Sequence, residues 1–217
     1  TLDTEGIYYE VELSNIYDKS LSSGWNWFSL NRTNDDMSLT NILSSLDDAN
    51  IEGDYIKNQS GYATYYDGFG WWGTLEEMNN LSMSKINLSN SGNITFEGED
   101  VDVTTTTISI SSGWNWISYL PQEAMDINTA LASLSPDNLD YLKGQTNSST
   151  YYTSGGVWYP DITLEPTKGY MIKSSTAEDL IYPNIERSDL SKDGAIPLNN
   201  KLAFNYRDYE HNASVTI

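Results

Sequence analysis

Apolar and polar residues alternate along most of the chain, which is typical of strands with one buried face. The alternation is clear over residues 107–110, and residues 169–173 (GYMIK) are expected to form a late strand. Two short segments instead place apolar residues at positions i, i+3, i+4 and i+7, which predicts one short amphipathic helix in each. These positions are Leu39, Ile42, Leu43 and Leu46 in the first segment and Ile127, Ala130, Leu131 and Leu134 in the second. We therefore expect a β-rich α+β fold.

Local signals indicate where these elements begin. Asp35 or Asp36 is expected to cap the first helix and Asp126 the second, since Asp side chains accept hydrogen bonds from the free N–H groups of a first turn. Residues 107–110 lead through a Ser-Gly pair into residues 114–117, which predicts a β-hairpin.

The two halves of the chain repeat each other. Residues 22–29 (SSGWNWFS) return as residues 111–118 (SSGWNWIS), and residues 54–57 (DYIK) return as residues 140–143 (DYLK). A Thr-Tyr-Tyr triplet also recurs, and Trp72 is matched with Trp158. Because the matches occur in the same order in both halves, they identify a tandem repeat. Each repeat is expected to form a small antiparallel sheet or barrel with one short helix.

The repeat sets the expected domain boundaries. Residues 1–15 are interpreted as a leading strand or the end of a preceding unit. Residues 16–101 form the first repeat and residues 102–185 the second. Residues 186–217 are interpreted as a linker followed by the first strand of another domain, so we expect the chain to be a segment of a longer protein.

The charge excludes several kinds of partner. The 217 residues include 31 Asp and Glu against 11 Lys and Arg, a formal net charge of −20. Such an anion is repelled by nucleic acid and by anionic membrane surfaces. No apolar run reaches the roughly 18–20 residues that span a bilayer. We therefore expect neither a nucleic-acid partner nor a membrane span.

The residue types available also argue against catalysis. The chain has no Cys and a single His, His211, which excludes thiolate chemistry and metal sites built from several histidines. Paired carboxylates can serve a glycosidase, but a repeat of this size is not expected to hold a deep cleft. The chain is expected not to be an enzyme.

All seven Trp lie in the repeated motifs. The first interpretation is that they form the core of each repeat, because large aromatic side chains dominate small cores. The alternative is a sugar- or peptide-binding platform built from aromatic residues beside the Gly-containing turns, where side chains are better placed to be exposed. The candidate ligand-binding residues are Tyr65, Tyr66, Trp71, Trp72, Tyr151, Tyr152, Trp158 and Tyr159.

Acidic residues gather between the repeats, and Ca²⁺ is the cation that clustered carboxylates are suited to bind. The candidate ligands are Glu97, Glu99, Asp100 and Asp102. A solvated acidic surface that favours solubility is the alternative interpretation.

The chain also contains Asn-x-Ser/Thr sequons, which predict glycan attachment if the source is eukaryotic. They begin at Asn31, Asn58, Asn80, Asn87, Asn93, Asn147 and Asn212.

The order of motifs resembles a known repeat. Residues 113–118 (GWNWIS), a short helix, Tyr-Tyr, Trp and residues 164–173 (LEPTKGYMIK) are similar to the "GWN…GKGY" repeats of large secreted and surface-attached microbial proteins. The resemblance covers residues 104–183 and, less closely, residues 16–101, where the Pro-Thr-Lys-Gly-Tyr turn is missing. It implies an extracellular repeat protein used for adhesion or assembly, without a catalytic site. Residues 206–210 resemble the opening of the Ig-like domains that accompany such repeats.

The expected function is therefore that of a non-catalytic extracellular or cell-surface segment. It would serve as a structural, assembly or adhesive module of a larger, acidic and glycosylated surface protein or filament. Its partners would be neighbouring modules, copies of the same protein, or a surface glycan. The alternative is a carbohydrate- or peptide-binding module that uses the aromatic residues beside the turns. Binding requires those rings to be exposed on a common surface, whereas the structural interpretation buries them.

Overall fold

The computed structural model describes residues 15–46 and 49–184. These residues belong to one compact unit that contains both repeats. The leading strand expected in residues 1–15 falls almost entirely outside the described residues. The linker and the following strand expected in residues 186–217, together with His211, lie outside them as well.

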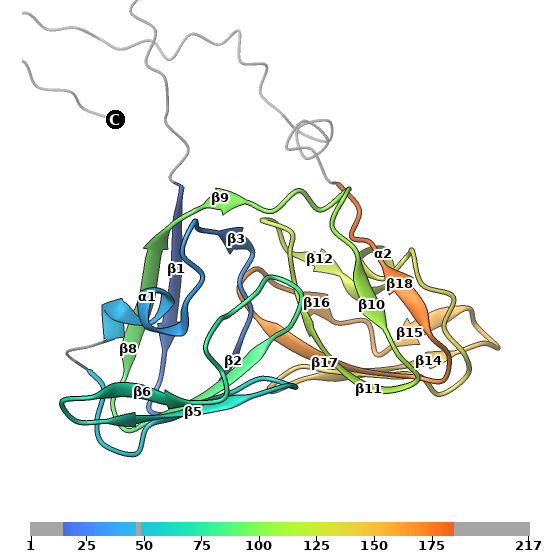
Figure 1. Cartoon of the computed structure of the whole chain (residues 1–217). Helices are drawn as coiled ribbons and strands as arrows, with labels where there is room; N and C mark the ends of the chain where they lie inside the picture. The colour runs from blue at the N-terminus through green and yellow to red at the C-terminus, as the bar shows by residue number, and fades with distance from the viewer. Residues whose placement is uncertain (1–14, 47–48, 185–217) are drawn as a thin grey trace, which may run out of the picture. The chain divides into compact units, whose positions relative to one another are not determined.

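Each repeat contributes one five-stranded antiparallel sheet (Figure 1). The first has the order β2 (Gly24–Phe28), β7 (Ser84–Leu88), β4 (Tyr55–Lys57), β5 (Tyr62–Tyr66) and β6 (Gly70–Gly73). The second has the order β11 (Gly113–Ser118), β17 (Gly169–Ser174), β13 (Tyr141–Lys143), β14 (Ser148–Tyr152) and β15 (Val157–Tyr159). The two orders are equivalent, and neither sheet closes. The β-rich fold with repeated antiparallel sheets is confirmed, and each sheet is open rather than a barrel.

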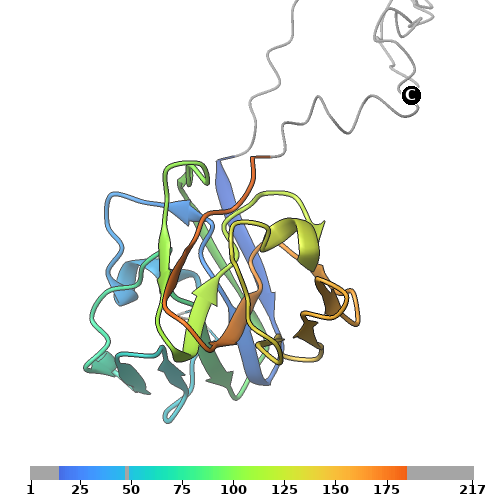
Figure 2. The same cartoon turned by 90° about the vertical axis from the view of Figure 1, so that its right-hand side faces the viewer.

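Four two-stranded antiparallel pairs complete the fold, as Figures 1 and 2 show from two sides. In the first repeat, β1 (Ile16–Leu21) pairs with β8 (Gly92–Glu97), and β3 (Arg32–Thr33) pairs with β9 (Glu99–Asp100). In the second, β10 (Ile108–Ile110) pairs with β18 (Glu178–Leu180), and β12 (Met125–Asp126) pairs with β16 (Thr163–Leu164).

The hairpin expected between residues 107–110 and 114–117 does not form. Strand β10 pairs with β18 and β11 pairs with β17, so the chain passes from one sheet to another at this turn. Gly113 has φ 99°, and the Asn115 amide closes the turn. Its Oδ1 accepts from Ser111 N at 2.9 Å, and its Nδ2 donates to Ser111 O at 2.7 Å. Asn26 closes the equivalent turn of the first repeat, so the Gly-Trp-Asn motif redirects the chain.

The helices are short, as predicted. They are α1 (Leu39–Ile42), followed by the 3₁₀ turn η1 (Ser44–Leu46), and α2 (Ile127–Ala130). Asp126 caps α2 by accepting from Thr129 N at 2.9 Å, as expected. Ser38, and neither Asp35 nor Asp36, caps α1. The Asp36 carboxylate is already engaged by Ser38 N at 2.9 Å, which leaves the capping role to the Ser38 hydroxyl.

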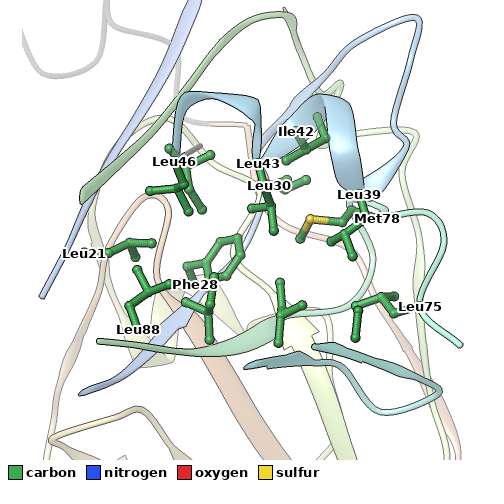
Figure 3. Close-up of a cluster of buried hydrophobic side chains, with 14 of the residues drawn as sticks. Leu21, Phe28, Leu30, Leu39, Ile42, Leu43, Leu46, Leu75, Met78 and Leu88 are labelled. Atoms are coloured by element: carbon green, nitrogen blue, oxygen red, sulfur yellow. The ribbon is translucent and has the colours of Figure 1, made fainter. Parts of the chain in front are cut away.

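The core of the first repeat is mainly aliphatic (Figure 3). Buried side chains from the sheet, α1 and η1 meet there, among them Leu21, Phe28, Leu30, Leu39, Ile42, Leu43, Leu46, Ile56, Ile86 and Leu88. The prediction that the tryptophans form the core is wrong for most of them. Only Trp158 is fully buried, and Trp71 packs partly against the core. In β2 the tryptophans alternate with the buried Asn26 and Phe28, so the two-residue period of the strand turns them outward.

Within residues 15–46 and 49–184, no helix has the length and apolar character that crossing a membrane requires.

Candidate functional site

The residues that face away from the core define what we call the outer face of each five-stranded sheet. Directly paired residues give one row across each sheet. In the first repeat this row is Trp25, Asn87, Tyr55, Thr64 and Trp72. In the second it is Trp114, Lys173, Tyr141, Thr150 and Tyr159. Each row therefore has an aromatic residue at both ends and a tyrosine in the middle.

The rings in these rows contact one another. Trp25 and Tyr55 meet edge to face with centroids 6.3 Å apart, and Trp114 and Tyr141 do so at 6.1 Å. Tyr62 stacks on Tyr55 at 5.9 Å. Because neighbouring rings restrict one another's rotation, the outer faces present partly fixed aromatic surfaces at low cost in side-chain entropy.

Four of the eight predicted ligand-binding residues lie on the outer faces and are exposed: Tyr66, Trp72, Tyr152 and Tyr159. Trp72 and Tyr159, at the row ends, are 63% and 67% exposed. The other four, Tyr65, Trp71, Tyr151 and Trp158, occupy the opposite strand positions. There they form the pairs Tyr65–Trp71 and Tyr151–Trp158, with centroids 5.6 and 5.5 Å apart.

Trp158 is therefore not a ligand-binding residue, since it is only 3% exposed. Sequence comparison had matched it with Trp72, but Trp158 pairs with Tyr151 as Trp71 pairs with Tyr65. The loop before β15 is one residue longer than the loop before β6, and a shift of one residue moves a side chain to the other face. Tyr159 is the structural counterpart of Trp72.

Sequence reasoning missed the tryptophans of the Gly-Trp-Asn-Trp motif as candidate surface residues. Trp25 and Trp114 are exposed at their row ends, and Trp27 and Trp116 are half-buried. The alternation of Trp with the buried Asn and Phe or Ile of the same motif was the signal that identified the outward side.

Reciprocal hydrogen bonds join the two repeats along the edge strands β2 and β11. Gln145 of the second repeat accepts from Trp27 N at 2.8 Å and donates to Trp25 O at 2.8 Å. Gln59 of the first repeat accepts from Trp116 N at 2.7 Å and donates to Trp114 O at 3.0 Å. Each Gln amide thus pairs with a strand edge as the backbone of another strand would. We call this contact, with the side chains that flank it, the repeat junction.

A lysine lies between the two tryptophans at the centre of the junction. Lys85 Nζ is 3.8 Å from the ring centroid of Trp27 and 4.2 Å from that of Trp116. Met171, at the position of Lys85 in the second repeat, places Sδ 3.2 Å from the same ammonium. The face of an indole ring attracts a cation, so Lys85 links one ring from each repeat.

Other features of the surroundings oppose this attraction and disfavour the charged form of Lys85. Burial, followed by the nearby Lys57 and Lys143, lowers the pKa of the Lys85 ammonium to about 8. A second lysine in place of Met171 would bring a fourth positive charge to this point. The difference between the repeats at this position therefore limits the repulsion at the junction.

The Pro-Thr-Lys-Gly-Tyr turn of the second repeat docks on the first. Thr167 O accepts from Ser29 N at 3.0 Å, and Lys168 O accepts from the Ser29 hydroxyl at 2.8 Å. A Cβ on Gly169 would lie 2.6 Å from Met83 Cβ and 2.9 Å from Phe28 O, so the close approach requires glycine. Met83 occupies the position of Gly169 in the first repeat and fills the shared space.

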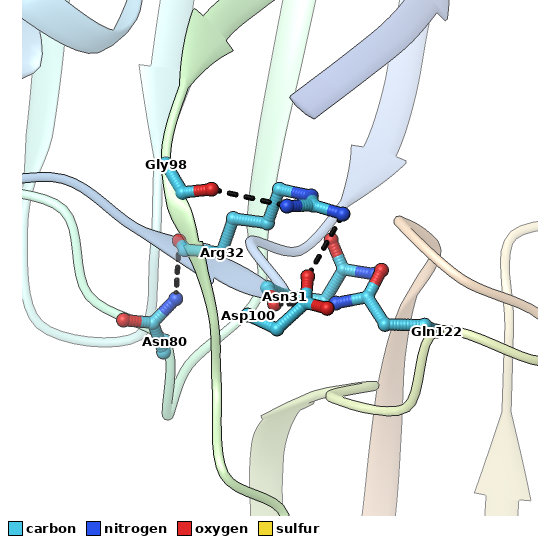
Figure 4. Close-up of polar contacts among 6 residues, drawn as sticks. All are labelled: Asn31, Arg32, Asn80, Gly98, Asp100 and Gln122. Carbon is cyan, nitrogen blue, oxygen red and sulfur yellow. Dashed lines mark hydrogen bonds and ion pairs between the residues drawn. The ribbon is translucent and has the colours of Figure 1, made fainter. Parts of the chain in front are cut away.

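The four acidic residues proposed as Ca²⁺ ligands do not form a site. Among the described residues, no three acidic or histidine side chains come together in an arrangement suited to a metal ion. Asp100 instead pairs with Arg32 at 2.8 Å (Figure 4). Asp102 accepts from Thr104 N at 2.9 Å and so caps a local turn. Glu97 and Glu99 are exposed, and they belong to different strands, β8 and β9. The structure therefore supports the alternative of a solvated acidic surface.

The sequons fall in very different surroundings. Asn31 is buried and donates through Nδ2 to Gln122 at 2.9 Å (Figure 4), and Asn80 donates to Arg32 O at 2.7 Å. Asn58 is also buried. At Asn31 and Asn80 the Nδ2 atom that would carry a glycan is already a hydrogen-bond donor, so attachment there would break these contacts. Asn93 and Asn147 are exposed, Asn87 is half-buried, and Asn212 lies outside the described residues.

Comparison of the chain with protein-family models, curated sequences and solved structures finds no match. A function for this chain is therefore inferred from the geometry of the outer faces and the repeat junction.

Substitution of Gly169 by alanine should weaken the docking of the repeats. The added methyl group overlaps Met83 and a backbone oxygen, so we expect a loss of about 1–3 kcal/mol in the free energy of unfolding. Urea denaturation measures it. Gly155→Ala, at an exposed turn position, is the matched control and should change stability by less than about 0.5 kcal/mol. Equal effects of the two substitutions would contradict the docking role of the turn.

The lowered pKa of Lys85 predicts a pH dependence of stability. The folded protein releases this proton near pH 8, whereas an unfolded lysine holds it to about pH 10.4. Because the unfolded state then binds more protons, stability should rise with pH across this interval. The melting temperature of the wild type, compared with that of Lys85→Met, should therefore increase between pH 8 and 10. A constant difference would show that the two indole rings keep Lys85 fully charged.

Proposed function

We propose that the two repeats form a non-catalytic glycan-binding module of a larger extracellular or cell-surface protein. The observation that carries this proposal is the exposure of aromatic residues from both repeats on the outer faces. The exposed set comprises Trp25, Tyr62, Tyr66 and Trp72 in the first repeat and Trp114, Tyr152 and Tyr159 in the second. Large exposed apolar surfaces on a folded protein usually mark an interaction site.

The chemistry of the outer faces suits sugars. An aromatic ring stacks on the C–H face of a pyranose, and polar groups beside it select the hydroxyl pattern. Asn87 and Thr64 lie between the aromatic residues in the row of the first repeat, and Thr150 lies between them in the second. The net charge of −20 disfavours nucleic acid, the other polymer that commonly stacks on aromatic residues.

A spacer or assembly role is the second candidate. The reciprocal glutamine contacts favour it, because they hold neighbouring repeats in a fixed arrangement, as a stalk or fibre requires. The two roles are compatible in an adhesive protein, where a spacer also carries the binding surface. The resemblance to GWN…GKGY repeats agrees with either role.

Screening chain 1–217 on a broad glycan array tests the proposal. We expect binding that survives a Ca²⁺ chelator, since the carboxylates between the repeats do not form a metal site. Trp72→Ala and Tyr159→Ala should each weaken binding about tenfold, equivalent to roughly 1.4 kcal/mol. Both side chains are exposed, so stability should change little.

Phe69→Ala provides the matched control. Phe69 is the most exposed of the large hydrophobic residues that the structure describes, at 78%, but it belongs to the loop before β6 and not to a row of the sheet. Its removal should leave glycan binding unchanged. An array without binding, combined with self-association of the chain, would reject the glycan proposal in favour of assembly.

A further inference from the structure

A cleft of about 160 Å³ lies at the repeat junction. From the first repeat it is lined by Lys19 of β1 and Trp27 of β2. From the second it is lined by Gln145, Thr146 and Asn147 of the β13–β14 turn and by Lys168. It is smaller than the pockets of roughly 300–1,000 Å³ that hold drug-sized ligands. The cleft therefore suits a single ring-sized group.

Lys19 is an unusual residue at this position. It lies between the buried Tyr17 and Leu21 in the strand alternation of β1, at a position that normally carries an apolar side chain. The protein is strongly acidic, yet Lys19 forms no ion pair within the described part of the chain, where the pairs are Arg32–Asp100 and Lys168–Glu165. Partial burial of an unpaired ammonium is unfavourable, so the charge needs an explanation.

The groups around Lys19 add to the positive charge of the cleft. Burial lowers the pKa of the Lys19 ammonium, Lys168 lowers it further, and Glu165 partly opposes them. Lys168 Nζ bonds Glu165 at 2.6 Å, so these three side chains together carry one net positive charge. Lys143 also lies nearby, 5.5 Å from the centroid of the Trp27 ring. A single negative charge would balance Lys19, Lys168 and Glu165, and Lys143 adds positive potential beside the Trp27 ring.

We propose that this cleft binds the carboxylate of a hexuronic acid, a six-membered sugar ring that carries one negative charge. Lys19 and Lys168 supply the positive charge, and the Thr146 hydroxyl and Asn147 amide supply hydrogen-bonding groups for the sugar hydroxyls. Trp27 supplies apolar surface for the C–H groups of the ring. The site is distinct from the row-end aromatics of the outer faces and does not depend on their binding a glycan.

The lining favours an acidic sugar over other anions. Two lysines and no arginine line the cleft, so its charge attracts an anion as point charges and the neighbouring polar groups decide which anion fits. The amide and hydroxyl groups exceed what a bare carboxylate needs, but they match the several hydroxyls of a sugar.

Calorimetric titration of chain 1–217, produced without N-glycans so that Asn147 stays free, tests the site. The probes are glucuronate, glucose, acetate and sulfate. We expect glucuronate to bind, and glucose and acetate to bind at least tenfold more weakly. Lys19→Met should abolish the preference for glucuronate over glucose. It should also raise the melting temperature, because it removes an unpaired charge and keeps the apolar stem.

Asp18→Asn is the control, because Asp18 is an exposed residue of β1 next to Lys19, lies outside the cleft and changes the net charge by one unit. It should leave glucuronate affinity unchanged. Absence of glucuronate binding overturns the proposal, and equal binding of acetate or sulfate overturns the assignment to a sugar. Binding that survives Lys19→Met but is lost in Trp72→Ala would place the ligand on the outer face. That last result would reject the cleft and support the glycan proposal for the outer face.

Discussion

The edges of β2 and β11 impose the constraint on which the arrangement of the two repeats depends. An unpaired strand edge presents free N–H and C=O groups, which either bind another chain or must be satisfied within the protein. Gln145 and Gln59 satisfy them, because a primary amide has both a donor and an acceptor. Each repeat therefore completes the edge strand of the other, and the exchange of equivalent contacts resembles an isologous dimer interface within one chain.

This reciprocal geometry explains why the two copies differ at particular positions. Where a residue meets its own counterpart, two identical large or charged side chains cannot both be accommodated. Met83 faces Gly169, and Lys85 faces Met171, so in each pair one copy carries the group that the other leaves out. The absence of the Pro-Thr-Lys-Gly-Tyr turn from the first repeat follows the same logic. The turn of the second repeat docks against Met83, which the first repeat carries at the position of Gly169.

The sequence predicted the strands, the short helices and the repeat, since each depends on local periodicity or on direct comparison of the halves. The sequence-based prediction failed for features that depend on which strands pair and in which register. The outward direction of Trp25 and Trp114 and the one-residue shift between Trp72 and Trp158 depend on register, which one extra loop residue changes. Glu97 and Glu99 are close in sequence but belong to β8 and β9, which pair with different strands, and this also depends on pairing. Comparison of the two halves matches Gln59 with Gln145 but cannot reveal their partners. These lie more than 100 residues away for Gln145 and more than 50 for Gln59.

Differential scanning calorimetry of chain 1–217 tests most directly whether the glutamine contacts make the repeats one cooperative unit. The wild type should unfold residues 15–184 in a single transition, with equal calorimetric and van't Hoff enthalpies. The double variant Gln59→Ala/Gln145→Ala should separate this into two transitions, because each repeat keeps its own core but loses its partner. Two transitions in the wild type, or one unchanged transition in the double variant, would contradict the account.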